Sequence, residues 1–141
     1  MSFVYRDQLW EGADLLSLGV ASFGHIGGTH YQNNHDIGPY LAKVNAGEFP
    51  VYRALTPTAE ETLIRETILQ FKLGYLRPAY FLKKFGVDIR ERFATAFANL
   101  DKAGYLAETG ETIRLTRDGL LQVDRLLTEF FLPQHLGQRY T

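Results

Sequence analysis

The apolar positions of the chain fall into two patterns, and the first is a continuous run over residues 14–23. A run of this length between glycines is typical of a strand that is buried on both faces, as in a parallel sheet. The chain offers no βαβ neighbours for such a strand. We therefore expect 14–23 to be partly disordered or abnormally paired, because an unpaired apolar strand invites association. The apolar residues of the run are Leu15, Leu16, Leu18, Val20 and Phe23.

From residue 56 onward the apolar positions recur at helical spacing. Either Thr56 with Pro57, or Thr58 with Glu61 as a capping box, begins the first helix, which Gly74 ends. The pattern then predicts helices over 78–85 and from Asp88 to Gly104, a hairpin over 105–115, and a last helix from Thr116 to Pro133. This order over 56–132 is close to a winged-helix arrangement.

The flanking segments predict smaller elements. Residues 3–11 form a strand or an ordered arm, Asp36 caps a short helix over 37–46, and 49–55 is extended. The tail 133–141 is loosely held. The sequence thus predicts an α+β, mainly helical fold divided into 1–55, 56–132 and the tail 133–141.

Composition excludes several classes of protein. The 141 residues carry a formal net charge of −1, which gives no nucleic-acid or anionic-membrane footprint. There is no cysteine, so disulfides, thiolate metal sites and cysteine nucleophiles are excluded for this chain alone. The lack of disulfides is compatible with a cytoplasmic location. No apolar run is long enough to span a membrane.

Residues 24–36, GHIGGTHYQNNHD, read as a loop rich in glycine, histidine and asparagine. His25, His30 and His35 recur every five residues, a spacing that shares neither a helix face nor a strand face, so we predict no metal site. The glycines could form a phosphate nest, but no P-loop or GxGxxG motif accompanies them. Plain turn chemistry is the better interpretation.

Two further features have competing interpretations. Arg65 lies among apolar neighbours, where it could grip a carboxylate or pair with Glu61 or Glu66. The predicted third helix and hairpin mix basic residues with acidic ones, so their near-neutral face argues against DNA binding.

The ordered series of motifs resembles one known family. GADLLSLGVASFGHIGGTHYQNNHDIGPY, then LTPTAEETLIRETIL, FKLG, KKFGVDI, LDKAGYL and IRLTRDGLLQVDRLL, resemble the end of the barrel and the helical domain of oxygen-independent coproporphyrinogen III oxidases, which are radical-SAM enzymes. The family's glycine after Asp-Leu-Leu is Ser17 here. The family's CxxxCxxC motif is absent.

The resemblance implies a fold and a function. The fold would be the end of a radical-SAM (β/α) barrel, one strand with a loop and a helix, followed by the winged-helix-like C-terminal domain. The parent protein would use S-adenosylmethionine and a 4Fe-4S cluster to decarboxylate porphyrinogen propionates oxidatively in haem biosynthesis. This chain alone would bind no cluster and would not be catalytic, so its partners would be the missing N-terminal barrel and a tetrapyrrole substrate.

The resemblance and residue chemistry also suggest site residues, none of them catalytic or metal-binding. The expected cofactor-binding residues are Ala21, Ser22, Phe23 and Gly24, and the expected substrate-binding residues are Gln32, Asn33, Tyr40, Arg53 and Arg65. Two alternatives stay open. One is a haem-trafficking or haem-modifying relative, with His25, His30 or His35 as axial ligand; the other is a stand-alone winged-helix binding module.

Overall fold

The computed structural model describes residues 4–131, and the chain divides into two compact units, Met1–Thr62 and Leu63–Thr141. The predicted arm at Phe3, the helix stop at Pro133 and the tail 133–141 extend outside the described residues.

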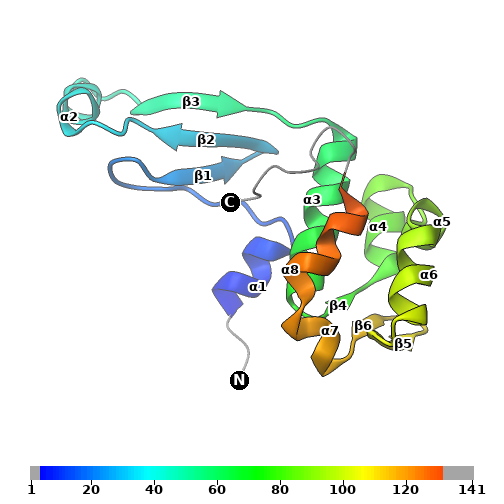
Figure 1. Cartoon of the computed structure of the whole chain (residues 1–141). Coiled ribbons are helices and arrows are strands. Elements are labelled where there is room, and N and C mark those ends of the chain that lie inside the picture. The colour runs from blue at the N-terminus through cyan, green and yellow to red at the C-terminus, as the bar shows by residue number, and fades with distance from the viewer. Residues whose placement is uncertain (1–3, 132–141) are drawn as a thin grey trace. The chain divides into compact units, whose positions relative to one another are not determined.

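The first unit contains a three-stranded antiparallel sheet in the order β1-β2-β3 (Figure 1). Helix α2 connects β2 to β3, so Asp36, as predicted, stands at a helix start. Its side chain makes no cap hydrogen bond. The elements are α1 (Val4–Trp10), β1 (Phe23–Ile26), β2 (Thr29–Asn33), α2 (Ile37–Asn45) and β3 (Val51–Leu55).

The predicted N-terminal strand is wrong, because Val4–Trp10 form helix α1. Residues 14–23 do not form a strand buried on both faces; they are irregularly paired, as expected for an apolar run without neighbouring strands. Before Phe23, which opens β1, this segment contributes an isolated antiparallel bridge between Leu15 and His25, and Ala21 and Ser22 exchange single backbone hydrogen bonds with Asn34 and Asn33. Leu18 is 83% exposed. The described residues supply no parallel neighbour for the segment, so its apolar side chains have nothing to be buried against.

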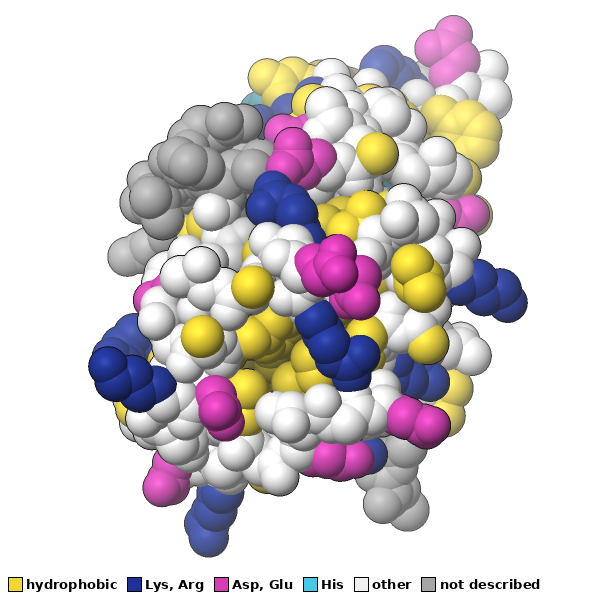
Figure 2. Space-filling view, turned by 90° about the vertical axis from the view of Figure 1, so that its right-hand side faces the viewer, with side chains coloured by type: hydrophobic (Ala, Val, Ile, Leu, Met, Phe, Trp, Pro, Cys, Tyr) yellow, Lys and Arg dark blue, Asp and Glu magenta, His cyan; other side chains and the backbone are white. Residues whose placement is uncertain are grey.

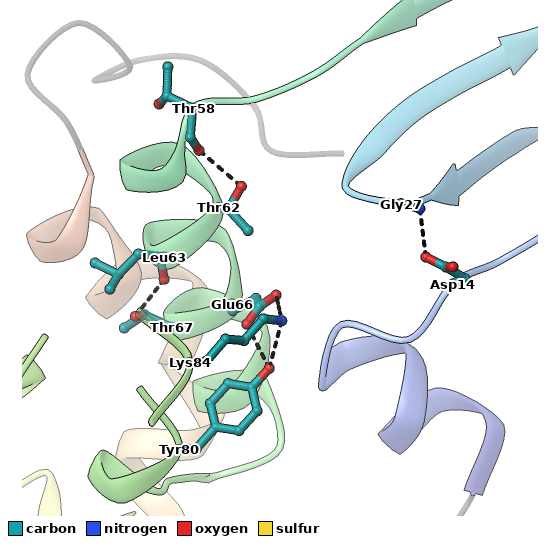
Figure 3. Close-up of polar contacts among 9 residues, drawn as sticks. All are labelled: Asp14, Gly27, Thr58, Thr62, Leu63, Glu66, Thr67, Tyr80 and Lys84. Atoms are coloured by element: carbon teal, nitrogen blue, oxygen red, sulfur yellow. Dashed lines mark hydrogen bonds and ion pairs between the residues drawn. The ribbon is translucent and has the colours of Figure 1, made fainter. Parts of the chain in front are cut away.

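The predicted loop 24–36 is largely a β-hairpin. Gly27 and Gly28, with φ of 56° and 81°, connect β1 to β2. A two-residue turn with positive φ at both positions matches the right-handed twist of the flanking strands, and glycine adopts it without steric cost. The backbone N–H of Gly27 also donates to Asp14 Oδ1 at 2.9 Å (Figure 3).

The second unit contains most of the helices and a small sheet of order β4-β6-β5. Figure 1 shows its helices and the β5–β6 hairpin in the order that the sequence predicts. Helix α3 begins in the first unit and continues into the second. The elements are α3 (Ala59–Lys72), β4 (Tyr75–Leu76), α4 (Pro78–Phe85), α5 (Ile89–Arg92), α6 (Ala94–Lys102), β5 (Leu106–Thr109), β6 (Ile113–Leu115), α7 (Arg117–Leu121), α8 (Val123–Leu126) and the 3₁₀ helix η1 (Leu127–Phe130).

In this part of the chain, the structure confirms a helix start predicted from the sequence, but two of the predicted helices are interrupted. Thr58 and Glu61 form the predicted capping box, with Glu61 N–H donating to Thr58 Oγ1 at 3.2 Å and Thr58 N–H to Glu61 Oε2 at 2.8 Å. The helix predicted from Asp88 is instead broken at Phe93, whose ring packs edge-on against Phe130 at 5.2 Å. The last helix is likewise broken at Gln122. Tertiary packing has overridden local helix propensity here.

The hydrophobic core lies entirely in the second unit. Within residues 4–131, every fully buried apolar side chain falls between Leu63 and Phe130, and Phe71, Phe93 and Phe97 all pack around Phe130. Among the described residues of the first unit, only Gly24, His25, Asn33 and Asn34 are buried, and most of the large apolar side chains are exposed. The second unit therefore has its own core, and the first is held mainly by its sheet and its polar contacts.

Candidate functional site

The turn before β1 and the first residue of β1 carry three of the predicted cofactor-binding residues. Ala21 has a φ of 60°, which is costly for a residue with a Cβ and is the only such case among the described non-glycine residues. Its N–H donates to the carbonyl of Asn34 at 2.8 Å, and Ser22 Oγ donates to the carbonyl of Gly19 at 2.7 Å. The Phe23 ring, by contrast, is exposed. The Ala21 N–H and the Ser22 hydroxyl are thus bonded within the first unit, and the Phe23 ring is exposed to solvent.

Asn33, at the end of β2, ties this turn to the preceding segment. The side chain is buried, and Nδ2 donates to the carbonyls of Ser17 and Gly19 at 3.4 and 3.1 Å and to Ser22 Oγ at 3.1 Å. A buried amide with three partners holds backbone in place rather than facing a ligand. The contacts of Asn33 therefore give it a structural role, and its role in substrate binding stays a prediction.

Two tyrosine hydroxyls also hydrogen-bond to the backbone of the segment before β1. The Tyr31 hydroxyl accepts from the N–H of Ser17 at 2.9 Å, and the Tyr40 hydroxyl on α2 accepts from the N–H of Gly19 at 3.1 Å. Gly24 lies directly opposite Tyr31 in the β1–β2 ladder, with the ring over its Cα. A glycine is needed at position 24 because a side chain there would collide with the tyrosine ring.

Gln32 and Arg53 form a polar pair across β2 and β3. They are register partners, and Arg53 Nε donates to Gln32 Oε1 at 2.8 Å. Gln32 Nε2 donates in turn to the carbonyl of Ala21 at 3.3 Å. The Arg53 side chain is exposed, and its Nη groups have no hydrogen-bond partner within residues 4–131. A guanidinium held at Nε with open Nη donors is suited to a carboxylate.

A cavity of about 290 Å³ opens beside these residues within the first unit. Tyr31, Asn33 and Tyr40 contribute polar atoms, and the remaining walls are largely apolar. The cavity is small for a ligand site. Its lining is Leu16, Ser17, Leu18, Tyr31, Asn33, Tyr40, Val44, Gly47, Glu48, Phe49 and Pro50.

The histidines are closer than their spacing suggested. His25 and His30 face each other across the Gly27–Gly28 turn, with ring centroids 4.5 Å apart, so the argument from spacing was wrong for this pair. His35 lies instead against Tyr52, with centroids 4.9 Å apart. His25 is only 8% exposed and its Nδ1 has no partner within the described residues. Its burial leaves little room for a ligand as large as haem.

Arg65, the remaining predicted residue, lies half-buried on α3 in the second unit. Its role as a substrate ligand stays a prediction.

A buried charged cluster beside Arg65 in the sequence was not predicted. Glu66 is 2% exposed, and its two carboxylate oxygens accept from Lys84 Nζ at 2.6 Å and from the Tyr80 hydroxyl at 2.7 Å (Figure 3). Lys84 Nζ also donates to the Tyr80 hydroxyl at 3.0 Å. The signal for it was the four-residue spacing of Tyr80 and Lys84 on one helix.

The cluster perturbs two of its members. Burial raises the pKa of Tyr80 above its ordinary value, with a further contribution from Glu66. Burial by itself lowers the pKa of Lys84, but the hydrogen bonds and charge of Glu66 and Tyr80 outweigh it, so the pKa of Lys84 is raised overall. The cluster is an ion pair within the second unit.

The side chains that could ligate a metal decide whether this chain could hold the 4Fe-4S cluster that the resemblance implies. The chain has no cysteine, and no group of three or more His, Asp or Glu side chains in residues 4–131 could hold a metal ion. A 4Fe-4S cluster held by cysteine thiolates therefore does not fit this chain. The Phe23 ring is exposed, and its contact with an adenosyl group stays a prediction.

The surface carries no basic stripe on the face that Figure 2 shows. Lys and Arg side chains alternate there with Asp and Glu side chains around a hollow with apolar residues in it. This mixture fits the near-neutral composition and gives no support to DNA binding. Among the helices of residues 4–131, none combines the length and apolar character needed to cross a bilayer.

Sequence comparison defines the class of protein that this chain resembles: the oxygen-independent coproporphyrinogen III oxidases. The predicted resemblance is confirmed. The enzyme from Pseudomonas aeruginosa is 27% identical over 135 residues, which cover 91% of this chain, and an enzyme from Helicobacter pylori is 29% identical over 132 residues, which cover 89%. No protein-family model matches the chain.

One solved structure has the same fold. Coproporphyrinogen III oxidase (HemN) from Escherichia coli, described as a radical SAM enzyme, matches 84% of this chain with a TM-score of 0.67 and 22% identity. The chain spans less than a third of these relatives, namely 29% of the Pseudomonas protein and 28% of the Escherichia chain.

Proposed function

We propose that this chain is the C-terminal part of a radical-SAM protein that oxidatively decarboxylates porphyrinogen propionates, and that it is inactive alone. The observation that carries the proposal is the mismatch of coverage: about nine-tenths of this chain matches less than a third of each oxidase. The chain has no cysteine to hold the cluster, so the cluster would be held by the remaining part. We place the complete protein in the cytoplasm, where its thiolates stay reduced.

The second unit supports the finer part of the fold proposal. The order of helices α3–α6, the β5–β6 hairpin and the helical segments α7, α8 and η1 supports the proposal of a winged-helix-like domain. The first unit would be the end of the barrel, in which residues 14–23 contribute a strand and α2 the following helix. The boundaries that we propose remain 1–55 and 56–132.

In the assembled protein, the first unit would contribute contacts rather than chemistry. Phe23 would lie against the adenosyl group, with Ala21, Ser22 and Gly24 shaping the backbone beside it. Arg53, held by Gln32 at 2.8 Å, would bind a substrate propionate through its open Nη donors. Tyr40 and Asn33 complete the substrate side that we propose for the first unit, and Arg65, in the second unit, is proposed as a substrate ligand by itself.

The test is the native protein purified without oxygen, followed by an antibody against this chain. We expect the antibody to detect this sequence in a polypeptide well above 16.0 kDa, or in a complex with a cysteine-bearing subunit. That preparation should show iron–sulfur absorbance and should release 5′-deoxyadenosine with porphyrinogen, whereas the 141-residue chain should do neither. A native 16.0 kDa protein with no such partner would refute the proposal.

Two alternatives have direct tests. A haem-binding relative predicts a saturable visible-absorbance change on haem titration that is lost in His30→Ala or His35→Ala. A winged-helix module predicts DNA binding that weakens steeply as salt rises. The burial of His25 and the mixed surface charge favour neither.

A further inference from the structure

The β1–β2 hairpin holds His25 and His30 against each other as a cross-strand pair. His25 exchanges both of its backbone hydrogen bonds with Leu15, at 2.6 and 2.9 Å, so its N–H and C=O groups point away from His30, its register partner in β2. Opposed residues that do not bond to each other are the closely spaced pairs of an antiparallel ladder, and their side chains lie on one face of the sheet. The hairpin backbone thus brings the two imidazole rings together.

The separation of the rings is that of two imidazoles on one metal ion. The ring centroids are 4.5 Å apart, and the ring planes are inclined by 32°. A bond from zinc to an imidazole nitrogen is about 2.0–2.1 Å long, which places each ring centre about 3 Å from the ion and adjacent ring centres roughly 4.5–5 Å apart. The observed separation lies in that range, so an ion could be held with little movement of the backbone.

The His25 ring also carries a polar atom that the described residues leave unbonded. His25 is 8% exposed, and within residues 4–131 its Nδ1 has no hydrogen-bond partner. A buried polar atom without a partner is uncommon in folded proteins, and a bound ion or water molecule is one explanation for it. His30 is only half-buried, so an ion can reach the pair from solvent on that side. A space too small for haem is sufficient for a single ion.

The charge and the type of ligand indicate which ion fits. Asp14 accepts from the N–H of Gly27 at 2.9 Å, so a carboxylate lies at the turn that connects the two strands (Figure 3). Imidazole ligands suit zinc, copper and nickel rather than magnesium or calcium, and Cu²⁺ binds most tightly among the divalent first-row ions. No third imidazole or carboxylate of residues 4–131 joins the pair to form a metal-binding group. Water would complete the coordination, and we expect weaker binding than at a zinc site with three or four protein ligands.

We propose that His25 Nδ1 and one ring nitrogen of His30 bind a single divalent transition-metal ion, Cu²⁺ more tightly than Zn²⁺ or Ni²⁺. The ion would cross-link β1 to β2 next to the Gly27–Gly28 turn. This site goes beyond the proposed function and does not depend on it, because both ligands and the turn belong to this chain.

Titration of the 141-residue chain with Cu²⁺ tests the proposal. Calorimetry should show one saturable site per chain, and electron paramagnetic resonance of the complex should show splitting from two imidazole nitrogens. Zn²⁺ should raise the unfolding temperature of the first unit, because only the folded hairpin presents both rings to one ion. Absence of a saturable one-to-one site would overturn the proposal and leave the two rings as a stacked pair.

A pair of variants separates this site from adventitious binding. His30→Gln should weaken Cu²⁺ binding by about 10-fold or more, leave the splitting of one nitrogen and remove the effect of Zn²⁺ on unfolding. His30 is the better position for the change because His25 is buried, and substitution there would also disturb packing. Circular dichroism of metal-free His30→Gln should match that of the original chain.

His35→Gln is the matched control, since His35 lies against Tyr52 away from the pair. It should leave both the affinity for Cu²⁺ and the effect of Zn²⁺ unchanged. If His35→Gln weakens binding as much as His30→Gln does, the ion binds adventitiously to exposed histidine and the proposal is overturned. That result would leave the proposed function untouched, because the proposed function is tested on the native cysteine-bearing protein.

Discussion

Gly24 and Tyr31 face each other across the β1–β2 hairpin so closely that the tyrosine ring occupies the space of a side chain at position 24. A Cβ built on Gly24 would lie 2.2 Å from Tyr31 Cζ and 2.4 Å from its hydroxyl oxygen. The ring position in turn places the hydroxyl 2.9 Å from the Ser17 N–H. A glycine expected beside a cofactor is thus also required by the packing of the hairpin.

Gly24→Ala should therefore destabilise the first unit by about 1–3 kcal/mol, because the ring must move and the bond to Ser17 is lost. The single tryptophan of the chain, Trp10, lies in this unit and reports its unfolding in urea. Gly38→Ala is the control: nothing lies within 4 Å of the new methyl on α2, and alanine favours a helix. Equal stability of the two variants would contradict the packing argument.

Asn33 and Arg53, both predicted to bind substrate, should behave differently on substitution. Asn33→Ala removes a buried amide that serves two carbonyls and a hydroxyl, and should lower the free energy of unfolding by about 1–3 kcal/mol. Arg53→Ala removes an exposed side chain and should change stability by less than about 0.5 kcal/mol. In the native protein, Arg53→Ala should instead raise the KM for the porphyrinogen. An unchanged KM would remove Arg53 from the proposed site.

The features whose determinants lie close together in the sequence are those that could be predicted from it. The Thr58–Glu61 capping box and the helix from Pro78 to Phe85 were predictable because their determinants lie within a few residues. The Gly27–Gly28 hairpin was missed although it carries a two-glycine turn signal, because the polar composition of 24–36 suggested a loop. That turn also brings His25 opposite His30, which spacing alone did not reveal.

Other features could not be read from the sequence because they depend on distant partners. Residues 14–23 have the composition of a buried strand, but burial needs neighbours that the described residues do not supply. The break at Phe93 depends on its contact with Phe130, thirty-seven positions away. Of the candidate site, the Gln32–Arg53 pair required the β2–β3 register, including its irregularity at Gln32 and Asn33.

The Glu66–Tyr80–Lys84 cluster predicts a loss of stability at alkaline pH. The folded-state pKa values of Tyr80 and Lys84 are raised from ordinary values of 10.0 and 10.5. A group that holds its proton more tightly when folded contributes stability below its unfolded pKa, and that stability is lost as the pH rises through the folded pKa. The second unit should therefore unfold more readily above about pH 10.

Lys84→Met tests the same cluster at neutral pH. It leaves the buried Glu66 carboxylate with the Tyr80 hydroxyl alone, and should cost about 1–3 kcal/mol, reduced by the partial exposure of the lysine. Lys83→Met, at the neighbouring exposed position on α4, should be close to neutral. Thermal unfolding followed by circular dichroism measures both variants, and equal effects would show that the cluster contributes nothing specific.

Ala21 predicts an unusual gain in stability from glycine. Its φ of 60° places a Cβ in the left-handed region, at a cost of roughly 1–2 kcal/mol that glycine does not incur. Glycine also gives the unfolded chain more freedom, so Ala21→Gly should stabilise the first unit by about 0.5–1 kcal/mol net. The opposite sign is expected for Ala42→Gly on α2, where the backbone is helical, with a loss of about 1 kcal/mol. Urea unfolding monitored by Trp10 compares the two. If Ala21→Gly destabilises as much as Ala42→Gly, the turn before β1 is not strained, and the case for a functionally shaped backbone at Ala21 loses its physical basis.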